Sequence, residues 1–322
     1  MTENLKKSVP LIETRHLKKY FNTKKGALHA VDDVSITIPE GKTLGVVGES
    51  GCGKSTLGRT VLRLLEPTSG EILYRGNNIV GLRKNEMREM RTKMQIIFQD
   101  PFASLNPRMS VSQLIAEPIR VCKTIQGEEN IKKHVLQLMD TVGLARRFED
   151  TYPHELDGGR RQRIGIARAL AVDPEFIVCD EPVSALDVSI QAQILNLLMD
   201  LQDSRGLTYM FITHDLSVVK HISNEIMVMY LGQCVEKAPS DEIFADPKHP
   251  YTQALLGAIP IPDIDRRAEL QIIKGEVFSP INPKPGCRFA SRCQYACEEC
   301  QQGDMPLKEV SPDHFVACRL LY

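Results

Sequence analysis

The feature that most constrains the fold is a short run that is rich in glycine and ends in lysine and serine. The pattern G-x-x-x-x-G-K-[ST] is fitted by Gly48-Glu49-Ser50-Gly51-Cys52-Gly53-Lys54-Ser55. Apolar residues at 43–47 predict a buried strand before the run, and apolar positions at helical spacing predict a helix over 55–65 after it. A strand, a glycine-rich loop and a helix N-terminus together form a cradle for phosphate groups. The run therefore predicts a nucleotide site in an α/β fold.

The residues of this loop have distinct expected roles. Glycines allow the backbone N–H groups to turn inward, and the helix N-terminus adds positive potential. Lys54 is expected to reach the β- and γ-phosphates, and the Ser55 hydroxyl is expected to ligate Mg²⁺. The alternative is a glycine-rich turn that carries Gly-Lys-Ser by chance. The residues expected to contact the nucleotide are Gly48, Glu49, Ser50, Gly51, Cys52, Gly53, Lys54, Ser55 and Thr56.

Composition limits the classes of protein that remain. A chain of 322 residues has room for one large domain and a smaller module. The formal net charge of −1 gives no overall electrostatic footprint for nucleic acid. No apolar run approaches the roughly 20 residues that span a bilayer, and the N-terminus lacks the apolar core of a signal peptide. We therefore expect a cytosolic protein that contacts a membrane only through a partner.

Polar residues follow three other predicted strands. Gln99 follows a strand over 94–98, Asp180 and Glu181 follow a strand over 176–179, and His214 follows a strand over 209–213. The carboxyl ends of strands in α/β sheets are where ligands bind. Asp180 is placed to hold Mg²⁺, and Glu181 to polarise a water that attacks the γ-phosphate. The alternatives are a surface glutamine, two solvated acids and a structural histidine.

Between the first and second of these strands, the pattern changes to helical. Residues 104–152 contain no convincing strand and predict helices over 112–121 and 129–142. The chain returns to the core at a glycine pair that opens a helix through residue 170. We interpret residues 104–156 as a helical subdomain inserted into the α/β core. The returning residues are Leu156, Asp157, Gly158, Gly159 and Arg160.

Taken together, these motifs resemble an ABC-type ATPase domain over roughly residues 10–255. The resemblance implies a P-loop ATPase core at 1–258 with a helical subdomain and an antiparallel β edge. It also implies that Phe21 stacks on adenine, that Gln99 ligates Mg²⁺ or orients water, and that His214 contacts the γ-phosphate. The cofactors that it implies are ATP and Mg²⁺.

One motif departs from the family pattern. The usual signature L-S-G-G-Q is replaced by residues 156–160, with Asp157 in place of serine and Arg160 in place of glutamine. In the family, two domains sandwich two ATP molecules, and each signature faces the nucleotide on the other subunit. A carboxylate at Asp157 cannot donate to the γ-phosphate and would repel it, although Arg160 can offset its charge. Asp157 is also a good helix N-cap. Two alternatives follow for the dimer. Either its two ATP sites hydrolyse ATP unequally, in an asymmetric heterodimer, or the two sites work alike.

The C-terminal residues narrow the family further. The segments His249 to Leu256, Pro280 to Pro283, Gly286-Cys287 and Arg292-Cys293 resemble the extension of ATP-binding subunits of dipeptide and oligopeptide permeases. The resemblance implies an extension at 259–322 and an ATP-hydrolysing motor subunit at the cytoplasmic face of the cell membrane. It implies a second ATPase subunit, two integral-membrane permease subunits and, indirectly, an extracytoplasmic peptide-binding protein. No nucleic acid partner is expected.

Five of the nine cysteines lie in the last 36 residues. Four of them match the importer extension and have the spacing C-x5-C-x6-C-x17-C: Cys287, Cys293, Cys300 and Cys318. Cytosolic thiols do not pair stably as disulfides, so a metal is the default. We favour a [4Fe–4S] cluster over structural Zn²⁺, and independent reduced cysteines are the third alternative. Cys297 falls where the extension has an apolar residue, and we expect a buried thiol.

Two rival functions come from other classes. A soluble ABC ATPase that acts on nucleic acid or ribosomes would usually carry tandem ATPase domains or a coiled-coil insert with basic patches, and neither is found. An iron–sulfur redox enzyme gated by ATP would need a substrate pocket, and no stretch of the sequence predicts one.

Overall fold

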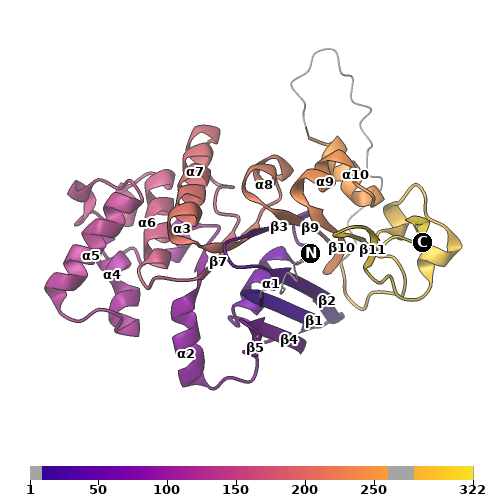
Figure 1. The fold of residues 1–322 in the computed structure, drawn as a ribbon, viewed down its shortest axis with the longest axis horizontal. Helices are drawn as coiled ribbons and strands as arrows, with labels where there is room; N and C mark the ends of the chain where they lie inside the picture. The colour runs from indigo at the N-terminus through magenta and orange to yellow at the C-terminus, as the bar shows by residue number, and fades with distance from the viewer. Residues whose placement is uncertain (1–8, 260–278, 322) are drawn as a thin grey trace, which may run out of the picture. The chain divides into compact units, whose positions relative to one another are not determined.

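The computed structural model describes residues 9–259 and 279–321, and they form two compact units. The first unit comprises the described part of residues 1–11 together with 39–42 and 81–210. The second comprises 12–38, 43–80 and the described part of 211–322. Strand β8 (Thr208–Ile212) has residues in both units. Figure 1 shows the fold with its helices and strands labelled. The predicted N-terminal segment 1–7 and part of the predicted extension, 260–278, lie outside the described residues.

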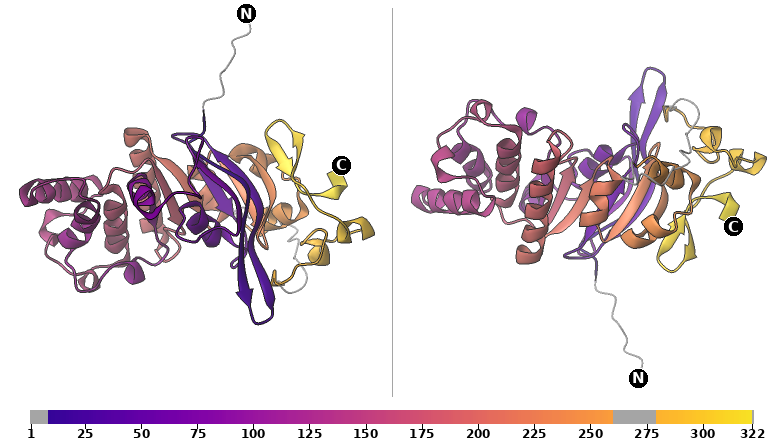
Figure 2. Two further views of the ribbon diagram at one scale, coloured as in Figure 1. Left: turned by 90° about the horizontal axis from the view of Figure 1, so that it is seen from below. Right: turned by 90° about the horizontal axis from the view of Figure 1, so that it is seen from above.

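An antiparallel sheet opens the second unit. Its strands are β1 (Ile12–Thr23), β2 (Gly26–Ile38), β4 (Ser69–Tyr74) and β5 (Asn77–Asn78), in the order β2-β1-β4-β5. Along β2, the side chains of Val34, Ile36 and Ile38 are buried and alternate with exposed residues, so one face packs inward. Figure 2 shows β1 and β2, in indigo, side by side up to their connecting turn. The predicted antiparallel edge is thus confirmed.

A second sheet of this unit carries the glycine-rich loop. β3 (Thr43–Val47) is fully buried and runs parallel to β9 (Glu225–Tyr230), which pairs antiparallel with β10 (Gln233–Pro239). β12 (His314–Val316) and β11 (Lys308–Ser311) complete the order β11-β12-β10-β9-β3. Among its described residues, the α-helices are α1 (Lys54–Val61), α8 (Leu216–Ile222), α9 (Ser240–Ala245) and α10 (Pro250–Gly257). Short 3-10 turns lie at Ala290–Arg292, Glu298–Gln301 and Arg319–Leu321.

A buried carboxylate joins the C-terminal segment to this sheet. Glu236 of β10 is fully buried and accepts hydrogen bonds from the backbone N–H groups of Lys248, at 2.7 Å, and His249, at 3.0 Å. His314 Nε2 of β12 lies 2.7 Å from Glu236 Oε1. A buried carboxylate is tolerated only where donors surround it. Residues 308–316 are therefore held to β10 by side chains as well as by strand pairing.

The first unit contains the remaining strands and most of the helices. β6 (Met94–Ile97) pairs parallel with β7 (Phe176–Asp180), as expected for strands joined through helices. The α-helices are α2 (Lys84–Lys93), α3 (Pro101–Ser104), α4 (Val111–Cys122), α5 (Glu128–Thr141), α6 (Gly158–Leu170) and α7 (Val188–Arg205). Short 3-10 turns lie at Arg146–Phe148 and Pro153–Glu155.

The predicted helical insert is confirmed as a set of helices. α4 begins where Ser110 forms a capping box with Gln113, whose side-chain oxygen accepts the Ser110 N–H at 2.9 Å. Its apolar face buries Leu114, Ile115 and Ile119. Residues 104–152, all of which are described, contain no strand. The bounds of the subdomain at 104–156 stay a prediction. The boundary between the ATPase domain and the extension at 258/259 also stays a prediction.

Within the described ranges, no helix is long and apolar enough to cross a membrane.

Candidate nucleotide-binding site

Backbone geometry makes the glycine-rich loop possible. Gly48 (φ +152°) and Gly53 (φ +107°) have positive φ angles, which side chains with a Cβ rarely adopt. A Cβ at Gly48 would lie 2.2 Å from the carbonyl oxygen of Met229, and one at Gly53 would lie 2.0 Å from that of Ala30. Both distances are far below van der Waals contact, so both positions require glycine. The loop is packed tightly against the backbone of its own unit.

Lys54 lies at the first position of α1 and points back into the loop. Its ammonium is buried and donates to the carbonyl oxygens of Gly48, at 2.8 Å, and Glu49, at 2.9 Å. Gly53 provides no capping side chain for the helix, and unsatisfied N–H groups at a helix N-terminus attract anions. A phosphate would compete with two neutral carbonyls for the Lys54 charge. The arrangement suits a nucleotide phosphate.

Cys52 of the loop is a buried thiol. Its sulfur lies 3.9 Å from Lys54 Nζ, yet burial raises the pKa of Cys52 more than the lysine charge lowers it. Because thiols react as thiolates, Cys52 is an inert member of the loop.

The first unit brings two other predicted residues together. Asp180 ends β7 and is fully buried, and Glu181 follows it with φ +47°, a conformation uncommon for a residue other than glycine. Gln99 Nε2 donates to Glu181 Oε2 at 2.9 Å. Ser184 Oγ donates to the Glu181 carbonyl oxygen at 3.1 Å, which ties down the strained turn. Unusual backbone held in place by its surroundings is frequent at functional sites.

The altered signature forms the start of α6. The Asp157 side chain accepts the backbone N–H of Arg160 at 2.8 Å, so the predicted N-cap is confirmed. Arg160 Nη1 also lies 2.8 Å from Asp157 Oδ2, and the Arg160 guanidinium lies 4.9 Å from the centre of the Phe148 ring. Each carboxylate oxygen of Asp157 therefore faces a donor of Arg160. Both side chains are about half exposed.

Phe21 and His214 belong to the second unit. Phe21 lies on β1, half-buried, with Lys19 Nζ 4.9 Å from the centre of its ring. His214 follows β8 and is exposed, and Asp215 caps α8 by accepting the Ser217 N–H at 2.8 Å. Lys54 and Ser55 lie in the same unit, whereas Gln99, Asp180, Glu181 and residues 156–160 lie in the other.

Sequence reasoning missed a polar network beside Phe21. The Tyr20 hydroxyl and the Arg288 guanidinium both donate to Asp32, and the Tyr20 ring stacks on His29 with centroids 3.8 Å apart. Burial alone would raise the pKa of Asp32, but hydrogen bonds from Tyr20 and His29 and the Arg288 charge lower it overall. Asp32 is thus a carboxylate that binds strand β2 to the C-terminal segment.

The cysteine module differs from its prediction. In residues 9–259 and 279–321, no group of three or more His, Cys, Asp or Glu side chains is arranged to hold a metal ion. Cys297, expected to be buried, is exposed, and its sulfur lies 3.4 Å from that of Cys300. Burial and neighbouring cysteines raise the pKa of Cys287 to about 11. The metal-binding module is therefore not supported by this arrangement of side chains.

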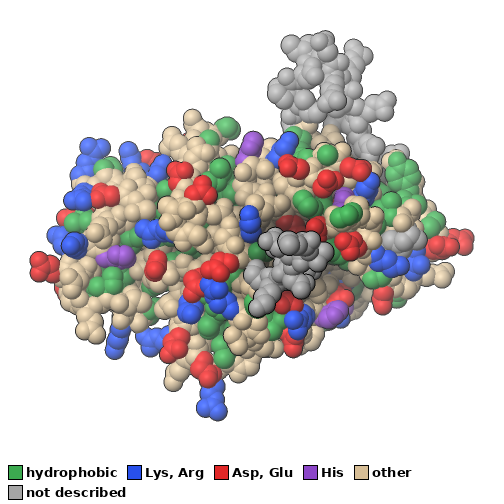
Figure 3. All heavy atoms as spheres, viewed as in Figure 1, with side chains coloured by type: hydrophobic (Ala, Val, Ile, Leu, Met, Phe, Trp, Pro, Cys, Tyr) green, Lys and Arg blue, Asp and Glu red, His purple; other side chains and the backbone are tan. Residues whose placement is uncertain are grey.

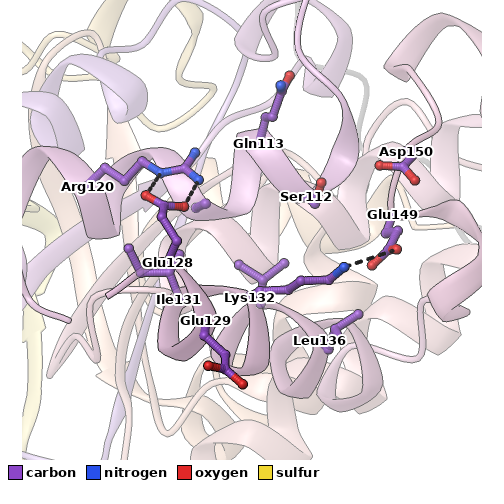
Figure 4. Close-up of a pocket in the computed structure, with 12 residues that line it drawn as sticks. Ser112, Gln113, Arg120, Glu128, Glu129, Ile131, Lys132, Leu136, Glu149 and Asp150 are labelled. Carbon is purple, nitrogen blue, oxygen red and sulfur yellow. Dashed lines mark hydrogen bonds and ion pairs between the residues drawn. The ribbon is translucent and has the colours of Figure 1, made fainter. Parts of the chain in front are cut away.

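The helical insert contains a pocket that no motif indicated. Figure 4 shows it between α4, α5 and the segment that follows them, with an Arg120–Glu128 ion pair at 2.6 Å and a Lys132–Glu149 pair at 3.9 Å. Its lining is of mixed charge. The face drawn in Figure 3 likewise mixes basic and acidic side chains, in keeping with the net charge of −1.

Comparison with known families gives two matches along the chain. The family described as "ABC transporter" matches residues 31–184. The family described as "Oligopeptide/dipeptide transporter, C-terminal region" matches residues 235–300. The first match includes the phosphate loop, Gln99, residues 156–160, Asp180 and Glu181, and the second includes much of the C-terminal extension; Phe21 and His214 lie outside both.

Curated relatives resemble the chain over nearly its whole length. It is 51% identical to the putative oligopeptide transport ATP-binding protein YkfD of Bacillus subtilis, covering 97% of this chain and 96% of that protein. It is 49% identical to the dipeptide transport ATP-binding protein DppF of Haemophilus influenzae, covering 99% of each. Among solved structures, the dimeric ATP-binding cassette MJ0796 in a post-hydrolysis state with ADP and Pi has a TM-score of 0.66 at 28% identity. That match covers 71% of this chain and 98% of the cassette.

Proposed function

We propose that this chain, which belongs to the ATP-binding subunits of oligopeptide and dipeptide ABC transporters, is the ATP-hydrolysing motor of a peptide import system. The observation that carries the proposal is the phosphate loop with its buried Lys54, in a chain whose C-terminal part matches the peptide-transporter family. ATP is the nucleotide that the family uses. When bound, Mg²⁺ would be held by Ser55 and Asp180 and would offset the charge of the phosphates.

The nucleotide residues divide into a binding set and a hydrolytic set. For binding, we propose that the loop amides and Lys54 hold the phosphates, that Ser55 and Asp180 hold the metal, and that Phe21 stacks on adenine. Support comes from the buried Lys54 ammonium and from the absence of a capping side chain at Gly53. For Thr56 and the rest of the loop, the proposed contacts are through the backbone.

For hydrolysis, we propose Glu181 as the group that polarises the attacking water. Gln99 is a third metal ligand or a water-orienting group, and His214 contacts the γ-phosphate. The Gln99–Glu181 hydrogen bond of 2.9 Å and the positive φ of Glu181 support a shared role for Gln99 and Glu181 in hydrolysis. A general base of this kind typically contributes 10²- to 10⁴-fold to the rate.

The altered signature leads to a proposal about unequal sites. We propose a heterodimer with a second ABC ATPase subunit in which hydrolysis occurs mainly at the nucleotide bound to this chain. The partner's site would be completed by Asp157 and Arg160, which lack the serine hydroxyl donor. The competing hypothesis, two equal sites, has support in the Asp157–Arg160 pair at 2.8 Å, which leaves little net charge. Mutating the catalytic glutamate of one subunit at a time separates them, since equal losses of ATPase activity favour equal sites.

Membership of the family supports a proposal about partners and location. We propose two integral-membrane permease subunits, an extracytoplasmic peptide-binding protein that acts indirectly, and a position at the cytoplasmic face of the cell membrane. The ATPase domain is proposed at 1–258 and the extension at 259–322. Co-expression of the chain with these partners and assay of peptide-stimulated ATPase activity tests the proposal, because a soluble ATPase that acts on nucleic acid would show no response to peptide.

A [4Fe–4S] cluster on Cys287, Cys293, Cys300 and Cys318, with Zn²⁺ as runner-up, remains a proposal. Its support is the thiol spacing and the fact that these sulfurs are near enough for their charges to interact. When bound, a metal would bridge the segments that carry the four cysteines. The side chains would have to rearrange first, with Cys297 leaving Cys300.

A further inference from the structure

Glu49, the second residue of the phosphate loop, is held by an arginine far away in the sequence. Arg292 Nη1 lies 2.8 Å from Glu49 Oε2, and Arg292 Nη2 lies 3.2 Å from Glu49 Oε1. The two residues are 243 positions apart. The Arg292 side chain is only 6% exposed, and its guanidinium meets the carboxylate as a two-pronged fork. Such a pair fixes both the position and the orientation of the carboxylate.

The backbone of Glu49 is held from the same side. Its N–H donates to the hydroxyl of Tyr251, a fully buried residue of α10, at 2.9 Å. Tyr251 packs edge-on against Tyr230 with ring centroids 4.7 Å apart, and its ring is tilted against that of Phe289 at 5.3 Å. Arg292 reaches the Tyr230 hydroxyl at 3.3 Å. A rigid aromatic cluster therefore supports both contacts with Glu49.

The charge of Glu49 is unfavourable for the task of the loop. A carboxylate beside a phosphate site repels the triphosphate, and in partly buried surroundings this repulsion is larger than in water. Arg292 pairs with both carboxylate oxygens, while the backbone oxygen of Glu49 accepts a hydrogen bond from Lys54 at 2.9 Å. The carboxylate is thus turned toward the C-terminal segment.

We propose that Arg292 is a positioning residue for nucleotide binding. It holds the Glu49 carboxylate away from the phosphates, so the C-terminal extension sets the ATP affinity of the loop. The inference rests on ATP binding at Lys54 and is independent of the transported substrate and of any metal on the neighbouring Cys293. It assigns a role in the ATP site to a residue outside every nucleotide motif.

The test compares nucleotide affinities of the full chain by displacement of a fluorescent ADP derivative with MgATP. Arg292→Gln releases a carboxylate that is free to approach the phosphates, and we expect MgATP to bind about tenfold more weakly. Glu49→Gln removes the repelling charge and serves as the reference for the double variant. The double variant Glu49→Gln/Arg292→Gln should bind MgATP as Glu49→Gln does, within about threefold, since no carboxylate is left to be held.

A matched control is available in the same unit. Arg63 makes a similar two-pronged contact with Glu66, from Nη2 to Oε1 at 2.9 Å and from Nε to Oε2 at 3.2 Å. Arg63→Gln should leave the MgATP affinity unchanged. In the assembled complex, Arg292→Gln should raise the KM for ATP while kcat stays near the wild-type value, because the chemical groups are untouched.

Two results would overturn the proposal. The first is a double variant as weak as Arg292→Gln alone, which would make the arginine merely structural or a support for metal binding. The second is wild-type affinity in Arg292→Gln. Where the glutamine variant does not fold, Arg292→Lys retains the charge and loses the fork. It should weaken MgATP about threefold and recover with Glu49→Gln, and no change in Arg292→Lys would equally contradict the proposal.

Discussion

The phosphate loop and the cysteine module belong to the same compact unit, yet they relate to their sequence in opposite ways. In the loop, glycines at fixed spacing impose backbone angles that few other residues adopt, and the cradle follows from eight consecutive positions. In the module, four cysteines must come together from segments up to 31 positions apart (318 − 287 = 31). The described arrangement does not assemble them as a ligand set. The conformation of a short loop can therefore be predicted from its sequence. The meeting of four distant cysteines cannot, because it depends on contacts that their spacing does not specify.

The largest expected effect concerns the nucleotide site, the region where the sequence prediction and the fold agree. Glu181→Gln keeps the size of the side chain and its contact with Gln99 but removes the charge that polarises water. We expect the variant to bind ATP while turnover in the assembled complex falls by about three orders of magnitude. Steady-state ATPase assays measure the loss. Normal turnover would show that Glu181 has no part in the chemistry.

The next prediction concerns the contribution that buried His249, in the C-terminal half, makes to the stability of the fold without any metal. His249 is buried and caps α10 by accepting the Tyr251 N–H at 3.0 Å, and burial lowers the pKa of His249 to about 4. The unfolded chain binds the proton at its ordinary pKa near 6.5. His249 therefore adds stability above pH 6.5, and that stability is lost as the pH falls toward 4.

The pKa difference of His249 corresponds to roughly 3 kcal/mol of unfolding free energy. Urea unfolding between pH 7 and 4.5 should show this loss in the wild type, beyond that caused by carboxylates. His249→Asn keeps a capping oxygen and has no titrating ring, so its stability should fall less over the same range. Identical pH profiles for the two proteins would place the ionised histidine in the folded state.

A smaller effect is expected from the loop lysine. Lys54→Ala removes the ammonium that is now shared by the carbonyls of Gly48 and Glu49, so ATP should bind about 30-fold more weakly. Direct titration of the full chain with ATP measures the change. Because the glycines still form the turn, far-UV circular dichroism and thermal unfolding should stay close to the wild type. Unchanged affinity would place the phosphates elsewhere.

The last of these predictions concerns the cysteine module, the second region in the comparison. If the proposed cluster forms, serine at Cys287, Cys293, Cys300 or Cys318 should each abolish metal binding, whereas Cys297→Ser should keep nearly all of it. Iron and zinc analysis with absorbance near 400 nm, where a [4Fe–4S] site absorbs broadly, distinguishes about four irons per chain from one zinc. Metal-free protein purified without oxygen would favour independent thiols, and loss confined to Cys297→Ser would change the ligand set.

Much of the fold could be predicted from sequence periodicity. The strand before the phosphate loop, strand β7 with Asp180 at its end, and helices α4 to α6 follow from apolar spacing and capping residues. The long strand β1 and the C-terminal strands were missed. The polar residues of β1 and the short length of β12, three residues, give little periodic signal.

The contacts that complete the site were beyond prediction for another reason. Arg292 and Glu49, and likewise Arg288 and Asp32, meet across more than 240 positions, and each pair looks in sequence like ordinary surface charges. Only the folded chain shows that both arginines are nearly buried. Gln99 and Glu181, by contrast, were predicted as separate strand-end residues, and the fold adds the hydrogen bond between them.

The central claim is that ATP hydrolysis by this chain drives peptide import, and transport by the complete assembly tests it most directly. The chain, its partner ATPase and the permease subunits would be reconstituted in vesicles with the peptide-binding protein on the opposite side from the ATPase. Accumulation of labelled peptide would then be measured with MgATP. We expect uptake that depends on ATP and is abolished by Glu181→Gln. Uptake that persists with Glu181→Gln, or a fully assembled ATPase-active complex that moves no peptide, would contradict the account.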